Sequence, residues 1–276
     1  MQRACPSRLD AYTPGMAILT HGSDLSLAPT AGVLVRQNGM NLRTAVRSLA
    51  AAGFTSVQLD AALSGIRPRE LNRRARKDLL AMVHREGVSL AGLDLPIPPD
   101  HFNDPVHVDR AVTAVTGAIE LAADLGRLPL SITLPTAQLD DDILSALAQC
   151  ADAHDVALSV HDEADVPALQ SWIEQVDLPC VGAAIDPAIA LAQKIDPAAW
   201  VLQLGRHLRV ARLSDWSLPD RQIVGQGDLR VSEYRIAMDL AASRRGPVVL
   251  DLRGMANPLD AARRSAKAWE DAGFMS

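Results

Sequence analysis

The distribution of apolar residues along this 276-residue chain is the feature that most constrains its fold. Short, nearly continuous apolar runs alternate with longer amphipathic stretches, and the connections between them are short. Parallel strands that are covered by helices have such apolar runs, and their regular alternation with helical stretches predicts repeated strand–helix units. The runs predict strands at 32–35, 56–59, 89–95, 130–134, 157–160, 181–185, 208–213 and 247–252, with 16–20 as an alternative for the first.

Amphipathic stretches between these runs predict helices at 41–52, 68–87, 104–126, 138–153, 166–176, 197–204, 231–243 and 258–272. Eight alternating pairs favour an α/β chain folded as a (β/α)₈ TIM barrel, which commonly forms one domain of about 250 residues. An open doubly wound sheet is the alternative, but no glycine-rich phosphate loop follows an early strand. We therefore predict a single barrel domain over residues 26–276, preceded by a short irregular arm over residues 1–25.

Composition restricts the compartment and the partners of the chain. The net charge of −6 argues against nucleic acid as a partner, and no apolar run is long enough to cross a membrane. Residues 1–25 lack the apolar segment of a secretory signal. The cysteines at positions 5, 150 and 180 are too scattered to form a disulfide framework, so we expect reduced thiols. These features predict a cytoplasmic protein that binds neither nucleic acid nor membrane.

Polar residues stand where the predicted strands end. In barrels of parallel strands, working residues lie at the C-terminal ends of the strands. A charged side chain at such a position either caps the following helix or points into the barrel mouth. For any single residue capping or surface exposure is the favoured explanation, and the recurrence on four successive strands, from the fifth to the eighth, weakens it. The polar residues at the ends of all the predicted strands are Asp60, Asp94, His161, Asp186, Arg212, Asp215 and Asp251.

Several short motifs carry a family resemblance. Residues 51–60, Ala-Ala-Gly-Phe-Thr-Ser-Val-Gln-Leu-Asp, resemble the start of the second strand in xylose isomerase-like barrels, a family that includes sugar phosphate isomerases and epimerases. Similar motifs follow in family order at 102–105, 122–126, 186–187, 213–215 and 225–228, so the resemblance covers roughly residues 30–273. It implies one divalent metal, Mn²⁺ or Mg²⁺, held by Glu, Asp, His and Glu from strands five to eight, and proton transfer on a sugar.

This chain departs from that ligand set. By strand position, the family's ligands correspond to His161, Asp186, Arg212 and Asp251, and the Glu of the second-strand motif to Gln58. A guanidinium group offers no lone pair and repels a cation. We therefore expect no metal or other cofactor, with Arg212 in the metal position and paired with Asp186 and Asp251. The alternative is one Mn²⁺, Mg²⁺, Fe²⁺ or Zn²⁺ held by His161, Asp186 and Asp251, with Arg212 swung aside.

The resemblance implies an isomerase, epimerase or lyase that acts on, or binds, a small polyol or keto-sugar. The sequence leaves open whether the chain is an enzyme, and a catalytically inactive member that serves as a binding or regulatory protein is the alternative. The expected partner is a carbohydrate-like small molecule, and a homodimer is one option for the assembly. The catalytic candidates are His161, Asp186, Arg212 and Asp251; the substrate-binding candidates are Asp60, Asp94, His101, Asp215 and Trp216.

Overall fold

Eight parallel strands form the centre of the molecule. The computed structural model describes residues 26–162, 165–241 and 246–273, so the arm predicted at 1–25 lies outside the described residues. The strands follow one another in the order β1-β10-β7-β6-β5-β4-β3-β2, and an isolated parallel bridge from Thr30 to Gln58 joins the two ends into a nearly closed barrel. Their bounds are β1 Leu27–Pro29, β2 Ser56–Asp60, β3 Ser89–Leu95, β4 Leu130–Thr133, β5 Leu158–His161, β6 Val181–Ile185, β7 Leu208–Leu213 and β10 Val248–Leu250.

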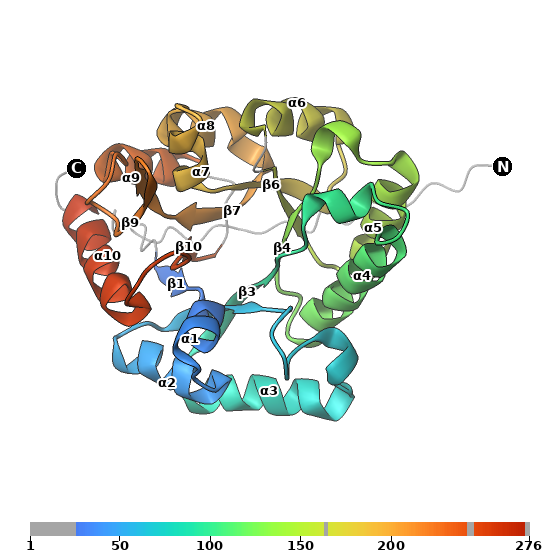
Figure 1. Ribbon diagram of the computed structural model, residues 1–276, viewed down its shortest axis with the longest axis horizontal. Helices are drawn as coiled ribbons and strands as arrows, with labels where there is room; N and C mark the ends of the chain where they lie inside the picture. Colours follow the sequence, from blue (N-terminus) through green and yellow to red (C-terminus); the bar gives the residue numbers. More distant parts are fainter. Residues whose placement is uncertain (1–25, 163–164, 242–245, 274–276) are drawn as a thin grey trace, which may run out of the picture.

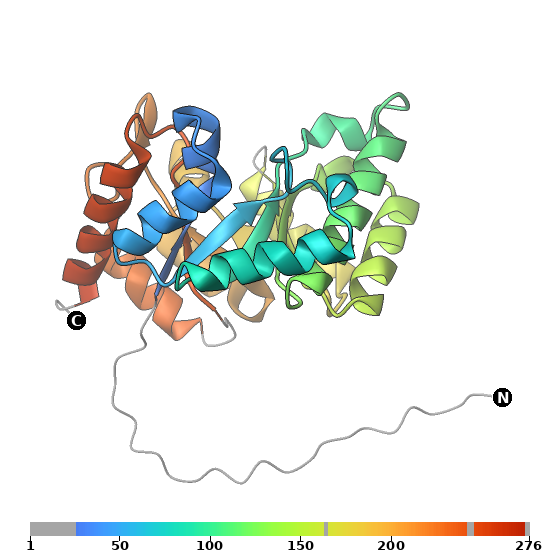
Figure 2. The ribbon, with the colours of Figure 1, turned by 90° about the horizontal axis from the view of Figure 1, so that it is seen from below.

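Helices surround the strands (Figure 1) and run along the outside of the barrel (Figure 2). Side chains that precede several helices cap them: Asn41, Asn72 and Asp165 each accept a backbone N–H of the first turn. None of the described helices is long and apolar enough to cross a membrane. The helices are α1 Ala31–Asn38, α2 Leu42–Ala51, α3 Arg73–Arg85, α4 Val108–Asp124, α5 Asp141–Ala153, α6 Val166–Val176, α7 Pro187–Ala192, α8 Pro197–Leu204, α9 Val231–Leu240 and α10 Pro258–Gly273.

The barrel prediction is confirmed, but several elements differ from the sequence-based assignment. The run at 32–35 lies in α1, and the first strand is the three-residue β1. A short apolar run cannot by itself distinguish a strand from a buried helix turn. Pro68 opens a 3₁₀ turn, and α3 starts only after Asn72. Sequence reasoning also missed α7 and an antiparallel hairpin, β8 Asp215–Ser217 with β9 Asp220–Gln222.

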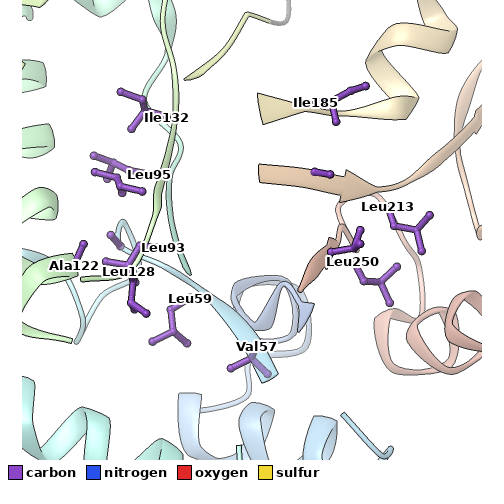
Figure 3. Close-up of a cluster of buried hydrophobic side chains, with 14 of the residues drawn as sticks. Val57, Leu59, Leu93, Leu95, Ala122, Leu128, Ile132, Ile185, Leu213 and Leu250 are labelled. Carbon is purple, nitrogen blue, oxygen red and sulfur yellow. The ribbon is translucent and has the colours of Figure 1, made fainter. Parts of the chain in front are cut away.

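Alternation along each strand separates an outer apolar shell from a barrel interior that holds the polar strand-end residues together with a small apolar cluster of Ala184, Val210 and Val249. Side chains such as Leu59, Leu93 and Leu250 are buried in the shell between strands and helices (Figure 3). The residues next to them along the strands face the other side because side chains in a strand alternate. Asp94 and Asp251 are such neighbours. Strand periodicity therefore brings the polar residues at the strand ends together inside the barrel mouth.

Candidate functional site

The Arg212 guanidinium lies at the centre of the barrel mouth. Its Nη2 donates to Asp94 Oδ1 at 2.7 Å, its Nη1 to Asp251 Oδ2 at 3.0 Å, and its Nε to His161 Nε2 at 3.3 Å. The side chain is 3% exposed. Since its partners come from β3, β5 and the end of β10, this one group ties together strand ends from across the barrel.

Two further arginines complete the cluster. Arg221 on β9 donates through Nη2 to Asp186 Oδ2 at 2.7 Å and through Nη1 to Asp251 Oδ2 at 3.4 Å. Arg253, two residues after Asp251, donates to Asp186 Oδ2 at 2.7 Å and to Asp251 Oδ2 at 2.8 Å. We call the six residues Arg212, Arg221, Arg253, Asp94, Asp186 and Asp251 the arginine network. Its three cations and three anions sum to zero formal charge.

The pairing of Arg212 differs in part from the expectation. Arg212 binds Asp251, as expected, but its second carboxylate is Asp94, while Asp186 is held by Arg221 and Arg253. The reason is geometric, because all three nitrogens of the Arg212 guanidinium are already directed at Asp94, Asp251 and the imidazole ring. The neutralisation of Asp186 therefore requires arginines from outside the barrel strands.

Asp186 also starts a helix. Its Oδ1 accepts the Ser214 hydroxyl at 2.6 Å and the Ala188 backbone N–H at 3.2 Å, which makes it the N-cap of α7. The carboxylate therefore has one oxygen engaged by the scaffold and the other by Arg221 and Arg253. Both oxygens are used within the protein.

The electrostatics keep the carboxylates charged and the imidazole neutral. Burial would raise the pKa of Asp186, but Arg221 and the neighbouring guanidiniums outweigh it and lower the pKa to about 2. Burial would also raise the pKa of Asp251, but Arg253 and the other arginines hold that pKa well below its usual value. Burial, together with the adjacent Arg212, lowers the pKa of His161 well below 6.5.

The residues present do not fit a divalent metal. A metal held by His161, Asp186 and Asp251 needs a lone pair from each. Here His161 Nε2, Asp186 Oδ2 and Asp251 Oδ2 each accept a guanidinium N–H instead. Within residues 26–162, 165–241 and 246–273, no group of three or more His, Cys, Asp or Glu side chains has a metal-binding arrangement. The guanidinium groups fill the place between the prospective ligands.

Asp60 forms a separate ion pair with Arg36 at the mouth, next to the arginine network. It is the register partner of Asp94 in the β2–β3 pair, and it binds Arg36 of α1 and the Ala62 backbone N–H. Burial raises the pKa of Asp60 against the opposing effects of Ala62 and Arg36. The carboxylate is thus a neighbour of the network on the side of β2.

Asp215 builds a loop rather than facing the mouth. The residue is fully buried, and its two oxygens accept backbone N–H groups from Trp216, Gly225, Gly227 and Leu229. A Cβ at Gly227 would lie 2.4 Å from Asp215 Oδ1, so the loop needs a glycine there. Asp215 therefore organises the 225–228 motif, and Trp216 lies half-buried in the middle of β8, where it pairs with Arg221 of β9.

His101 lies away from the network. It lines a cavity of about 730 Å³ between the loops after β2 and β3 and the helix α4, with walls that include Leu95 and Ile97. Its ring stacks against His107 with centroids 4.5 Å apart. No network residue lines this cavity, so His101 and the mouth belong to separate places on the molecule.

Sequence reasoning missed three arginines at the mouth. Arg253 carried a readable signal, because it stands two residues after Asp251, on the same face of an extended chain. Arg36 stands directly after the run assigned as the first strand, a signal that went unused, whereas Arg221 carried none because it lies on an unpredicted hairpin.

Comparisons with known proteins agree with this fold. No curated protein matches the chain. Among solved structures, the D-psicose 3-epimerase of Clostridium cellulolyticum H10 with D-tagatose has a TM-score of 0.70 at 14% identity, covering 90% of this chain and 97% of that chain. An L-ribulose 3-epimerase has a TM-score of 0.70 at 13% identity, covering 91% and 96%. A Mycobacterium smegmatis barrel protein, solved with magnesium, has a TM-score of 0.69 at 13% identity, covering 91% and 97%.

At these identities the solved structures show a common fold alone. The family model described as xylose isomerase-like TIM barrel matches residues 46–272, which is most of the chain. The protein therefore belongs to the xylose isomerase-like TIM barrel family.

Proposed function

We propose that this protein binds a small polyol or keto-sugar at the barrel mouth without a divalent metal, and that binding rather than turnover is its function. The observation that carries the proposal is the position of Arg212 between Asp94, Asp251 and His161. The similar structures are sugar epimerases, which supports a carbohydrate-type ligand in the same part of the barrel. In this proposal the guanidinium supplies the fixed positive charge that a metal ion supplies elsewhere in the family.

The protonation states favour binding over proton transfer. Asp186 and Asp251 remain ionised at neutral pH and have their oxygens occupied, so neither offers a proton or a free basic oxygen. His161 is neutral, but its Nε2 lone pair accepts the Arg212 N–H, and the residue is 4% exposed. A general base must reach the proton that it removes. None of these three residues meets that requirement.

Calorimetric titration in buffer with EDTA tests the proposal. D-Fructose, D-tagatose and sorbitol are suitable ligands, and at least one is expected to bind with a Kd of about 1 mM or lower. Added Mn²⁺ or Mg²⁺ is expected to leave the Kd unchanged within about twofold, since no ligand contact depends on the ion. Asp94→Ala is expected to weaken binding, because the second oxygen of Asp94 can accept a ligand hydroxyl, whereas Asp78→Ala, at an exposed position of α3, is the matched control.

Two results would count against the proposal. Binding that appears only after Mn²⁺ is added would restore a metal-dependent site. Formation of an epimer or aldose from the same sugars, followed by NMR, would replace a binding function with metal-free isomerisation. In that case His161 would have to exchange its hydrogen bond with Arg212 for one to the substrate.

A further inference from the structure

We infer that the sugar bound at the mouth carries an oxyanion, a carboxylate or a phosphate, and that Arg221 recognises it. This inference rests on the proposed function and names the chemical class of its ligand. Two observations support it. Most carboxylate oxygens at the mouth already accept hydrogen bonds from the protein, whereas Arg221 keeps N–H groups without a partner among the described residues. Arg221 and Arg253 are also more exposed to solvent than Asp186 and Asp251.

The acceptors of the network are almost fully used. Asp251 Oδ1 accepts the backbone and Nε groups of Arg253, and its Oδ2 accepts all three arginines. Asp186 Oδ1 accepts Ser214 and Ala188, and its Oδ2 accepts Arg221 and Arg253. The hydroxyl groups of a neutral polyol both donate and accept hydrogen bonds, and acceptor oxygens of this kind receive their protons. These two carboxylates have little capacity left to receive them.

Asp94 differs from the other two carboxylates. Its Oδ1 accepts Arg212, while Oδ2 has no hydrogen-bond partner among the residues that the structure describes. Its side chain is 17% exposed, whereas that of Asp251 is fully buried. One ligand hydroxyl can therefore donate to Asp94.

The donors, in contrast, are in excess. A guanidinium group has five N–H bonds. The Arg221 side chain makes two ion pairs, one through each terminal nitrogen, and its Nε has no partner among the described residues. It is 17% exposed on β9, at the mouth. Arg221 thus offers N–H groups that the protein itself does not satisfy.

The charges are also layered. The Arg253 side chain is 38% exposed and that of Arg221 17%, whereas Asp186 and Asp251 are 3% and 0% exposed. Arg221 and Arg253 therefore lie nearer the solvent than Asp186 and Asp251, whereas in the Arg212–Asp94 pair the carboxylate is the more exposed member. Beside Asp186 and Asp251, a ligand therefore meets N–H groups of Arg221 and Arg253, and guanidinium groups bind carboxylate and phosphate oxygens in a charge-assisted geometry.

Matched ligands test the inference by calorimetry in EDTA-containing buffer. D-Gluconate is compared with sorbitol, and D-fructose 6-phosphate with D-fructose, so that each pair differs by the oxyanion. At least one anionic member is expected to bind about tenfold more tightly than its neutral partner, and less tightly as NaCl is raised. Preference for gluconate or for the sugar phosphate identifies the oxyanion as a carboxylate or a phosphate.

Variants locate the contact. Arg221→Gln is expected to remove the roughly tenfold preference for the anion, measured as the ratio of the two Kd values within each ligand pair. Arg230→Gln is the control, since Arg230 is an exposed arginine paired with Asp196 and Glu233. Thermal melts check folding. If Arg221→Gln does not fold, Arg221→Lys keeps the charge without the planar fork and is expected to retain only part of the preference.

The outcomes separate the inference from the proposed function. Equal affinity for neutral and anionic members, or a preference that survives in Arg221→Gln, overturns the inference and leaves sugar binding intact. Failure of every sugar, sugar acid and sugar phosphate to bind overturns both.

Discussion

Arg212→Met is expected to destabilise the folded protein by about 3–5 kcal/mol, because removal of one partner leaves buried charges uncompensated. Arg212 is 2% exposed and pairs with both Asp94 and Asp251. Methionine fills much of the same volume, so the loss of charge rather than a cavity dominates the effect. Urea unfolding followed by circular dichroism measures the change in the free energy of unfolding.

Two companion variants isolate the cause. Arg230→Met removes an exposed arginine and is expected to change stability by less than about 1 kcal/mol. The double variant Arg212→Met with Asp94→Asn removes both members of one pair and is expected to be less destabilised than the two single changes added together. A loss below about 1 kcal/mol for Arg212→Met would show that the guanidinium does not hold the mouth together.

Stability is expected to fall in two steps as the pH is lowered. The folded-state pKa of His161 lies well below 6.5, so below about pH 6.5 the unfolded chain takes up a proton that the folded chain does not. The folded-state pKa values of Asp186 and Asp251 are also lowered, to about 2 for Asp186 from an ordinary 3.8. Their stabilisation is present above pH 4 and is lost as the pH falls toward 2.

The acidic step combines the contributions of two carboxylates, Asp186 and Asp251. The shift of Asp186 alone corresponds to roughly 2 kcal/mol. Urea unfolding at intervals between pH 8 and pH 2.5 measures both steps. His161→Gln is expected to remove the step that begins near pH 6.5 and to leave the acidic step in place, since Asp186 and Asp251 keep their arginines. A wild-type free energy that is flat between pH 7 and pH 5 would contradict a buried neutral His161.

Strand periodicity made much of the site readable from the sequence. Apolar runs place the ends of the fifth to eighth strands within a few residues, so His161, Asp186, Arg212 and Asp251 follow as a group at the mouth. Charge chemistry then predicts that an arginine among aspartates binds them rather than a metal. Arg212 does bind Asp251, and that contact depends only on neighbouring parallel strands, β7 and β10.

The rest of the network depends on segments without periodic patterns. Arg221 reaches Asp186 from a three-residue strand in a hairpin, and such short elements leave no periodic signal. The pairing of Arg212 with Asp94 joins residues 118 positions apart, across the barrel. Asp215 follows a predicted strand, as the other site candidates do. However, backbone N–H groups of the loop at 225–227 donate to its carboxylate, and the loop buries it. Contacts of this kind follow from the tertiary fold rather than from local sequence.

Metal content of the purified protein tests most directly the central claim, that guanidinium groups take the place of the divalent ion. The protein is expressed with added Mn²⁺, Fe²⁺ and Zn²⁺, dialysed, and measured by elemental analysis beside Asp186→Ala. The arginine network predicts less than about 0.1 metal ion per chain in both proteins, because His161, Asp186 and Asp251 each direct a lone pair at an arginine. About one tightly held ion per wild-type chain, lost in Asp186→Ala, would contradict it.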